Sequence, residues 1–351
     1  MDNKLKIWKI LFLLFLAVAT IFIIRNNRTR QEKEGDKNAS TSYMTDKGKV
    51  FGTFYNITYC ADSSMHSEIK DRLAQVDNSL SPFNKKSIIS AINENRDTLP
   101  NDMFLKVFTR AQEIAQETDG AFDITVAPLV NVWGFGFKKG YKVEENTIDS
   151  LRQFIGYSTL SIEDGRITKQ HPQTMLDCSA IAKGYGCDAV AELLCSKGIE
   201  NFMVEIGGEV VTKGVNSKGK SWNIGISKPT DNPGTGANEL QEVISISGKS
   251  MATSGNYRNF RIEGNKKIAH TIDPRTGYPV QHSLLSATVI ADDCTTADAY
   301  ATAFMVMGLE KAQEFCNAKR GIEAFFIYAD SRGEITTTMT KGFTEYTPNR
   351  K

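Results

Sequence analysis

The residues most suggestive of chemistry lie in one stretch, residues 176–188, which reads LDCSAIAKGYGCD. It places a carboxylate, Asp177, a lysine, Lys183, and two glycines at the predicted start of a helix. Such a start can hold a phosphate group, because its free backbone N–H groups and positive dipole end point at the ligand. The stretch therefore predicts a phosphate site. The alternatives are a solvated side chain for Lys183 and a turn cap for Asp177.

The same stretch also fits a dinucleotide-binding pattern. Residues 184–189 read G-x-G-x-x-A, and Glu205 follows about 20 residues later, where a ribose-binding acid would stand. That pattern requires a βαβ unit around it. The predicted elements on either side do not alternate regularly, and Glu205 belongs to a Glu-Ile-Gly-Gly-Glu turn. Both observations argue against dinucleotide binding by these glycines.

Two oxygen-bearing residues, Asp298 and Thr302, lie four positions apart in an apolar segment, residues 297–307. This spacing puts both on one face of a helix. Their hard oxygens suit Mg²⁺, which takes few protein ligands and completes its shell with water and phosphate oxygens. The alternative is a helix cap, because Thr295 and Asp298 resemble a capping box with Asp in place of Glu. Spacing alone leaves both interpretations open.

His270 stands shortly before Asp-Pro-Arg-Thr-Gly, a sequence typical of a turn whose shape Pro274 fixes. A histidine beside a turn can act as a general base near neutral pH. The alternative is a histidine at the end of a strand that backbone groups satisfy.

Several aromatic side chains come from predicted loops: Phe83, Trp133, Phe135 and Phe137. Any of these rings could stack on a planar ligand, although core packing is the commoner role of a large aromatic side chain.

The elements that must position these residues are mixed. A β-rich run at 50–59 is followed by helices predicted at about 65–79 and from about 101 to 118. A hairpin at 160–169 turns at Asp164-Gly165, and a helix covers 185–196. Strands separated by glycine turns come next, at 202–205, 210–213, 222–226 and 243–246. Hairpins with interspersed helices predict an α+β fold with largely antiparallel sheets.

Composition excludes several classes of function. The chain has 351 residues, enough for one large domain or two ordinary ones. The net charge is +1 and no long basic stripe is present, which argues against nucleic acid binding. Six cysteines form no C-x-x-C and four histidines form no H-x-x-x-H, which argues against zinc ribbons, thioredoxin-type chemistry and a histidine-rich metal site.

The N-terminal segment predicts membrane attachment. Three lysines precede an apolar run at 10–24 in which Thr20 is the only polar side chain. Counted from Ile7, with Lys9 snorkelling, the run reaches a membrane-spanning length of ~18 residues. The Ala-Val-Ala at 17–19 is followed by four large apolar residues, which disfavours cleavage there. The expected organisation has three parts: a signal or membrane anchor at 1–25, a polar tether at 26–49 and a folded domain at 50–345.

Together the segments resemble the ApbE-type flavin transferases, also called FAD:protein FMN transferases. The resemblance runs from about Val50 to Thr338 and lies in eight segments in one order. They are Phe51-Gly-Thr; Leu80-Ser-Pro-Phe with Asn93 downstream; Gly120-Ala-Phe-Asp-Ile-Thr-Val-Ala-Pro-Leu-Val; Leu176-Asp to Asp188; Glu205-Ile-Gly-Gly-Glu209; Ala252-Thr-Ser-Gly with Tyr257-Arg258; His270 to Pro279; and Ala297-Asp-Ala-Tyr-Ala-Thr-Ala303. Two departures are Phe51, where the family usually has Met, and the lack of a lipid-anchor cysteine near the apolar run.

The resemblance implies a roll-like α+β fold that holds FAD in a cleft, with Mg²⁺ on the diphosphate. Members move FMN from FAD onto a threonine or serine hydroxyl of a target protein and release AMP. Carried over by motif, the metal ligands are Asp298, Thr302 and the backbone oxygen of Ala180. The FAD-binding residues are Asp177, Lys183, Ala121, Phe122, Asp123 and Ile272, and Phe83 takes the place of an aromatic that stacks on the flavin. His270 is the expected acceptor of the hydroxyl proton, with Asp273 as the second candidate.

We therefore expect a Mg²⁺-dependent flavin transferase anchored in the cell inner membrane, with its catalytic domain facing the periplasm. The expected partners are FAD, the membrane and an acceptor flavoprotein, such as a subunit of a membrane electron-transfer complex of the Rnf or sodium-pumping quinone reductase type. Two alternatives stay open. An FAD diphosphatase would use the same site with water as acceptor, and a non-catalytic protein would store or deliver FAD.

Overall fold

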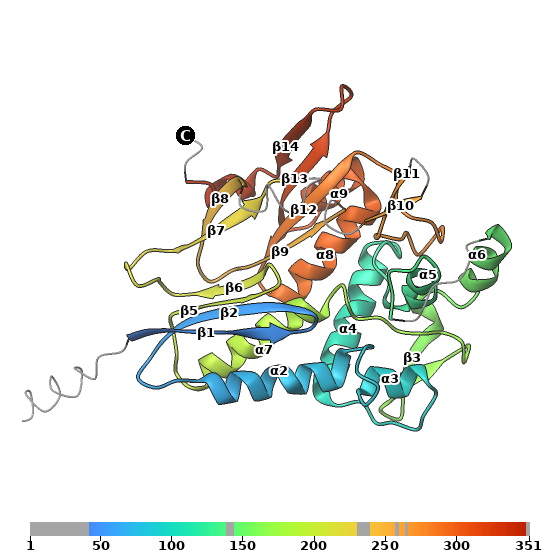
Figure 1. Cartoon of the computed structure of the whole chain (residues 1–351), viewed down its shortest axis with the longest axis horizontal. Coiled ribbons are helices and arrows are strands. Elements are labelled where there is room, and N and C mark those ends of the chain that lie inside the picture. The colour runs from blue at the N-terminus through green and yellow to red at the C-terminus, as the bar shows by residue number, and fades with distance from the viewer. Residues whose placement is uncertain (1–41, 138–143, 230–238, 257–259, 264–265, 349–351) are drawn as a thin grey trace, which may run out of the picture.

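An eight-stranded antiparallel sheet organises the fold (Figure 1). The structure is a computed structural model that describes residues 42–137, 144–229, 239–256, 260–263 and 266–348. The strands lie in the order β1 (Ser42–Val50), β2 (Thr53–Ala61), β5 (Phe202–Ile206), β6 (Glu209–Lys213), β9 (Ser250–Gly255), β12 (Leu284–Ala291), β13 (Glu323–Ala329) and β14 (Ile335–Met339).

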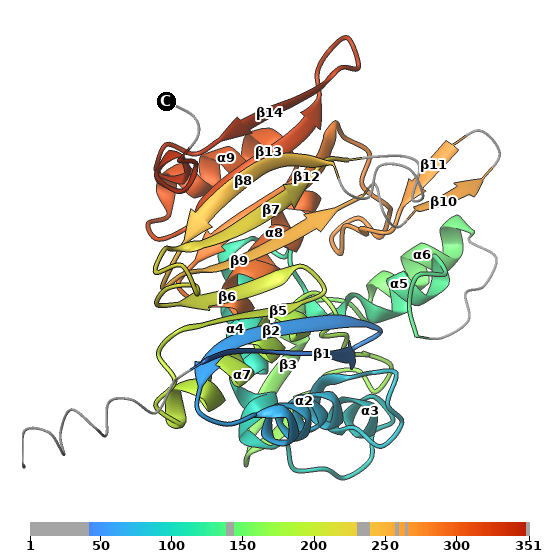
Figure 2. The same cartoon turned by 60° about the vertical axis from the view of Figure 1, so that its left-hand side comes forward.

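Helices cover one face of this sheet and a hairpin covers the other (Figure 2). The helices are α2 (His66–Leu80), α4 (Asp102–Glu117), α7 (Ala182–Ser196), α8 (Cys294–Met307) and α9 (Leu309–Ala318); the hairpin is β7 (Trp222–Ser227) with β8 (Leu240–Ile246). Alternate residues of β13 show the division, because side chains alternate across a strand. Ala324 and Phe326 pack with the helices, whereas Phe325 and Ile327 pack with the hairpin. The middle of the sheet is therefore buried on both faces.

Shorter elements complete the fold. They are α3 (Ile88–Asn93), α5 (Ala127–Val132), α6 (Glu145–Arg152), the 3₁₀ turns η2 (Ile124–Val126), η3 (Tyr157–Thr159) and η4 (Gly342–Tyr346), and the hairpins β3 (Leu160–Glu163)–β4 (Arg166–Lys169) and β10 (Phe260–Glu263)–β11 (Lys266–Ala269). In Figure 1, α5, α6, β10 and β11 gather at the same end of the molecule. Every strand pair among the described residues is antiparallel, which confirms the predicted α+β class.

The prediction of a polar tether over 26–49 is wrong for its last part. β1 begins at Ser42 and pairs with β2 along its whole length, so the fold starts before Val50. β1 is an edge strand of the sheet. Polar and charged side chains on an edge strand oppose pairing with other chains, which explains why its composition is unusual for a strand. Phe51 and Gly52 form the turn between the two strands, both with positive φ (50° and 73°).

The predicted membrane anchor at 1–25 and residues 26–41 lie outside the described residues, as do Tyr257 and Arg258 of the sixth family segment. Among the residues that are described, no helix combines the length and the apolar character needed to cross a bilayer.

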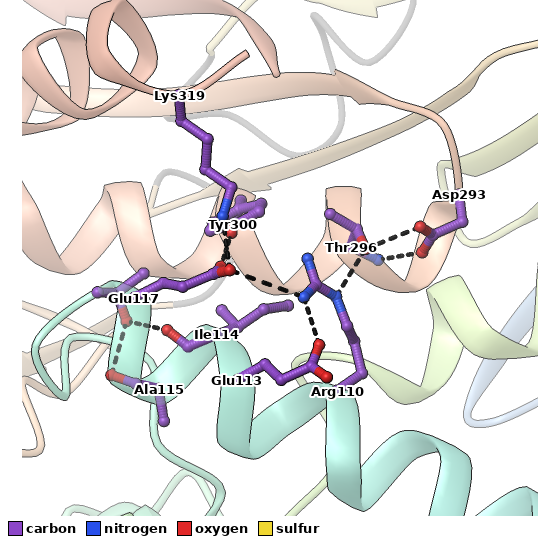
Figure 3. Close-up of polar contacts among 10 residues, drawn as sticks. Arg110, Glu113, Ile114, Ala115, Glu117, Asp293, Thr296, Tyr300 and Lys319 are labelled. Carbon is purple, nitrogen blue, oxygen red and sulfur yellow. Dashed lines mark hydrogen bonds and ion pairs between the residues drawn. The ribbon is translucent and has the colours of Figure 1, made fainter. Parts of the chain in front are cut away.

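A polar cluster fixes the side of α8 that faces α4 and α9 (Figure 3). The Tyr300 hydroxyl donates to Glu117, whose other oxygen lies 2.6 Å from the Lys319 ammonium. Arg110 donates through Nε to the Thr296 hydroxyl at 3.0 Å. Burial alone would raise the pKa of Glu117, but the hydrogen bonds from Lys319 and Tyr300 lower it below its usual value. The cluster fixes the rotation of the helix that carries the predicted metal ligands.

Candidate active site

The structure brings Lys183 of α7 and Asp298 of α8 together, although the two residues lie more than a hundred positions apart. The Lys183 ammonium is 3.3 Å from Oδ1 and 3.4 Å from Oδ2 of Asp298. The backbone N–H of Gly184 donates to the same Oδ2 at 3.0 Å. Asp298 is buried, with 1% of its surface exposed. The start of α7 and one face of α8 therefore form two walls of a single polar site.

The capping-box alternative for Thr295 and Asp298 is wrong. α8 begins at Cys294, and its N-cap is Asp293, whose carboxylate accepts a backbone N–H of the first turn at 2.7 Å. Asp188 of α7 also caps this end, accepting from the N–H groups of Cys294 at 2.9 Å and Thr295 at 2.8 Å. Burial raises the pKa of Asp188 to about 6, and the hydrogen bonds from Thr295 and Cys294 oppose the rise. Asp298 is thus left to the site.

The oxygens around Asp298 fit a divalent cation. The Gly184 N–H belongs to the first turn of α7, where backbone donors have no acceptor within the helix, and it donates instead to Asp298. Ala180 lies two residues before this helix begins. Thr302, one turn beyond Asp298, shares a hydrogen bond of 3.1 Å with Ser254. The described residues hold no group of three or more His, Cys, Asp or Glu side chains placed to hold a metal ion. A cation at Asp298 would have one carboxylate, with the Thr302 hydroxyl and the Ala180 carbonyl as the other candidate ligands, and such a set of oxygens suits Mg²⁺.

Glu209, the first residue of β6, is a site residue that the sequence analysis did not assign. Its Oε1 lies 3.1 Å from the Lys183 ammonium, and its side chain is 3% exposed. Lys183 therefore bridges two buried carboxylates, which excludes the solvated-lysine alternative. Burial alone would lower the pKa of Lys183, but Asp298 and Glu209 raise it above its usual value. The available sequence signal was the second acid of the Glu-Ile-Gly-Gly-Glu turn.

The two glycines of the opening stretch serve helix packing. α7 begins at Ala182, so Gly184 and Gly186 lie in its first turns. A Cβ on Gly184 would lie 2.2 Å from the carbonyl oxygen of Cys294, and one on Gly186 would lie 2.7 Å from the ring of Phe51. These glycines let α8 and the β1–β2 turn approach α7 closely, which accounts for both without a dinucleotide.

We expect Gly184→Ala to lower the free energy of unfolding by about 1–3 kcal/mol, because the added methyl group overlaps backbone atoms of α8 that no side-chain rotation can move. Chemical denaturation followed by circular dichroism measures the change. Cys195→Ala, at an exposed position of the same helix, is the control and should shift the free energy by less than about 0.5 kcal/mol. A Gly184→Ala protein as stable as the wild type would contradict the close packing of α7 on α8.

The segment that leads into α7 is pinned to two others. The Asn93 side chain donates to the Leu176 carbonyl at 2.9 Å and accepts from the Leu176 N–H at 2.6 Å. The Asp177 N–H donates to the Ile124 carbonyl at 2.7 Å. The Asp177 carboxylate accepts from the Ser179 N–H at 2.8 Å, and burial raises its pKa while Ser179 opposes the rise. Asp177 therefore caps the turn, as one of the two interpretations predicted. The contact of Asp177 with FAD stays a prediction.

The predicted FAD residues Ala121, Phe122 and Asp123 are all buried. Phe122 belongs to the main hydrophobic core. Asp123 accepts from the Thr125 N–H at 2.8 Å and the Tyr157 N–H at 2.7 Å. Burial raises the pKa of Asp123, and the hydrogen bonds from Thr125 and Tyr157 oppose the rise. This segment can therefore meet a ligand chiefly through its backbone, while its side chains hold the local structure.

The predicted turn at 273–277 is confirmed. The Gly277 N–H donates to the Asp273 carbonyl at 2.8 Å. The Arg275 guanidinium donates one hydrogen bond to each carboxylate oxygen of Asp273, both at 2.9 Å. This pairing raises the pKa of Arg275. Ile272 is buried beside Trp133, whose indole N–H donates to the Gly277 carbonyl at 2.9 Å. Asp273 thus has an evident structural role in the turn.

One loop after α5 connects the flavin-stacking candidate with the base candidate. Phe137 meets Phe83 edge to face with ring centroids 6.0 Å apart, and Phe135 meets His270 in the same way at 6.3 Å. Trp133 packs in the core, as predicted for such rings, and is 8% exposed. The same prediction is wrong for Phe83, which is 67% exposed. An exposed ring beside this loop is suited to stacking on a planar ligand.

The turn with His270 is also tied to the metal-ligand candidates. His270 follows β11 directly, and the next residue, Thr271, donates through its hydroxyl to the Asn256 side chain at 2.6 Å. Asn256 follows β9, whose Ser254 contacts Thr302. The end of β9 therefore contacts both the turn that carries His270 and the helix that carries Thr302.

A separate cavity of about 860 Å³ lies among α4, α7, β6 and the start of α8. None of the predicted site residues lines it. Charged groups on its rim pair with one another, Lys106 with Glu192 and Lys249 with Asp292, each at 2.5 Å. The cavity is therefore distinct from the site built on Lys183.

Comparisons with known proteins identify the family. The ApbE family model matches residues 51–326. A relative from Haemophilus influenzae, named FAD:protein FMN transferase, is 37% identical over 318 residues, which cover 86% of this chain and 90% of the relative. An Escherichia coli K12 relative of the same name is 32% identical over 350 residues, 96% of this chain and 97% of its own.

Solved structures give the same result. The flavin transferase ApbE from Vibrio cholerae has a TM-score of 0.78 at 35% identity, covering 87% of this chain and 99% of its own. The apo form of the Pseudomonas stutzeri flavinyl transferase ApbE has a TM-score of 0.78 at 31% identity, covering 88% and 97%. The matched residues 51–326 include both walls of the site. The chain belongs to the ApbE family.

Proposed function

We propose that this protein is an FAD:protein FMN transferase. It moves FMN from FAD onto a threonine or serine hydroxyl of an acceptor protein, forms a phosphoester and releases AMP. The observation that carries the proposal is the contact between Lys183 and Asp298 in a chain of this family. Phosphoryl transfer depends mainly on positioning and on stabilising charge at the phosphates, and this contact gathers the charged groups that such work needs.

Asp298, Thr302 and the Ala180 carbonyl are the proposed ligands of Mg²⁺. When bound, Mg²⁺ stabilises the negative charge of the diphosphate and of the leaving AMP. Lys183 adds a second positive charge at the same place, and its side chain is 28% exposed, so it is accessible to a bound ligand. The loose charge distribution of a phosphoryl-transfer transition state is stabilised by such fixed cations.

His270 is the proposed general base. The acceptor hydroxyl loses its proton as its oxygen attacks the phosphorus, and an imidazole can take that proton near neutral pH. Asp273 is a poorer candidate because both of its oxygens already bind Arg275. The exposed ring of Phe83 is proposed to stack on the flavin. The remaining proposed contacts to FAD are Asp177, Ala121, Phe122, Asp123 and Ile272.

Incubation of the purified protein with FAD, Mg²⁺ and a candidate acceptor protein tests the proposal. Transfer predicts flavin fluorescence on the acceptor after a denaturing gel, with one AMP released for each labelled acceptor. Free FMN and AMP with an unlabelled acceptor would instead identify an FAD diphosphatase. Tightly held FAD with no AMP in the presence of Mg²⁺ would identify a storage or delivery protein.

We further propose that the protein works outside the cytoplasmic membrane, anchored by residues 1–25, on a subunit of a membrane electron-transfer complex. The support is the apolar run and its preceding lysines in the sequence. Cell fractionation tests the location, and a search for covalently flavinylated proteins in the same cell tests the partner.

A further inference from the structure

The Lys183 ammonium lies between two buried carboxylates that come from different parts of the fold. It is 3.1 Å from Oε1 of Glu209 on β6 and 3.3 Å from Oδ1 of Asp298 on α8. An ammonium in this position opposes the approach of a divalent cation to Asp298, since like charges a few ångströms apart repel strongly in a poorly hydrated site. For a metal ion to bind Asp298, Lys183 must therefore have another partner.

Glu209 offers such a partner. Its second oxygen, Oε2, is buried and has no hydrogen-bond partner among the described residues. A buried carboxylate oxygen without a partner is unusual, because desolvation is not offset by a hydrogen bond. Glu209 follows Gly207 and Gly208, whose positive φ angles of 65° and 105° make the tight β5–β6 turn, so the sheet holds its backbone in place.

We propose that Glu209 is a positioning residue that receives the Lys183 ammonium when a divalent cation occupies Asp298. The ammonium shifts from its place between two carboxylates to Glu209 alone, where the free Oε2 accepts a hydrogen bond. Lys183 then stays beside the diphosphate instead of competing with the metal ion. This inference rests on the proposed function, because it requires the metal site at Asp298.

A charge count shows how Glu209 can be tested. Burial raises the pKa of Glu209, and the Lys183 ammonium opposes the rise. With both carboxylates ionised, Asp298, Glu209 and Lys183 sum to one negative charge, and a bound divalent cation brings the sum to one positive charge. Glu209→Gln makes each sum more positive by one. The change should therefore weaken binding of a cation and should not weaken binding of the anionic diphosphate of FAD. A general disturbance of the fold would weaken both.

The experiment uses Mn²⁺ as the probe, titrated into the FAD-free full chain at pH 8 and followed by electron paramagnetic resonance. We expect Glu209→Gln to raise the Kd for Mn²⁺ at least about tenfold. The Kd for FAD, measured in EDTA by fluorescence quenching, should rise by no more than about threefold. Glu205→Gln is the matched control, because Glu205 lies on the same turn and its carboxylate bonds Gly208 and not Lys183. It should change the Mn²⁺ affinity by less than about twofold.

Two further variants complete the test. Glu209→Asp keeps the charge and should recover most of the Mn²⁺ affinity. Asp298→Ala should abolish Mn²⁺ binding at the site. Wild-type Mn²⁺ affinity in Glu209→Gln would overturn the role of Glu209, and so would an equal loss of Mn²⁺ and FAD binding or an equal effect of Glu205→Gln. If Asp298→Ala bound Mn²⁺ like the wild type, the metal site of the proposed function would itself be wrong, and the inference would fall with it.

Discussion

Replacing Asp298 with alanine is expected to reduce FMN transfer by about 10²–10³-fold at saturating FAD, because Asp298 is the one carboxylate among the proposed Mg²⁺ ligands. A bound metal ion contributes several kcal/mol to stabilising phosphate charge, and each 1.36 kcal/mol is a factor of ten in rate. The measurement is the initial rate at which flavin fluorescence appears on the acceptor protein, taken across a series of Mg²⁺ concentrations.

Two variants separate this effect from damage to the fold. Asp298→Asn keeps an oxygen that can accept from the Gly184 N–H but lacks the charge, so it should fold and still lose Mg²⁺-dependent transfer. Asp292→Ala removes a carboxylate just before α8 whose side chain is 79% exposed, and it should leave the rate within about twofold. Undiminished Mg²⁺-dependent turnover in Asp298→Ala would refute the pairing of α7 and α8 as one site.

Local spacing predicted the part of this site that lies within one helix. The spacing places Asp298 and Thr302 on one face because a helix brings positions four apart together. The partners of Asp298 could not be found in that way. Its contacts with Lys183 and Gly184 depend on how closely α7 and α8 pack, and no local pattern reports the distance between two helices. The glycines that permit the close approach look, in the sequence, like a dinucleotide signature.

The capping box fails for a related reason. Thr295 and Asp298 have the spacing of a reciprocal cap, and a local pattern alone cannot show that other residues already serve the helix end. Asp293 caps α8 from within its own segment, and Asp188 reaches it from α7. A tertiary contact therefore displaced the local one. The residue that lost the capping role is the one proposed to bind the metal ion.

β1 and Glu209 are two features that the sequence did not predict, because their residues are polar. Residues 42–49 are polar because they form an edge strand, and only the register with β2 identifies them as part of the sheet. Glu209 is a charged residue at the start of a strand, where a solvated position is the ordinary expectation. The burial of Glu209 becomes evident only when β6 and α7 lie side by side, where the Lys183 ammonium forms an ion pair with the Glu209 carboxylate. Sequence reasoning therefore named candidate metal ligands but missed the second carboxylate that contacts Lys183.

His270→Ala is expected to reduce transfer by about 10²–10⁴-fold, the usual contribution of a general base, while FAD binds within about threefold of the wild-type affinity. Binding should survive because the ring of His270 lies edge to face with Phe135 in a loop, whereas the charged groups proposed to hold the diphosphate come from α7 and α8. The two measurements are single-turnover transfer to the acceptor protein and FAD affinity by fluorescence quenching.

His171→Ala is the matched control, because His171 also meets a phenylalanine edge to face, Phe154, with ring centroids 5.7 Å apart, and lies outside the proposed site. It should leave transfer within about twofold, since loss of a similar ring contact away from the chemistry changes stability more than rate. Wild-type transfer in His270→Ala would show that the hydroxyl proton goes elsewhere. Asp273 would then be the next candidate, and Asp273→Asn would have to lower the rate without loosening the turn that Arg275 holds.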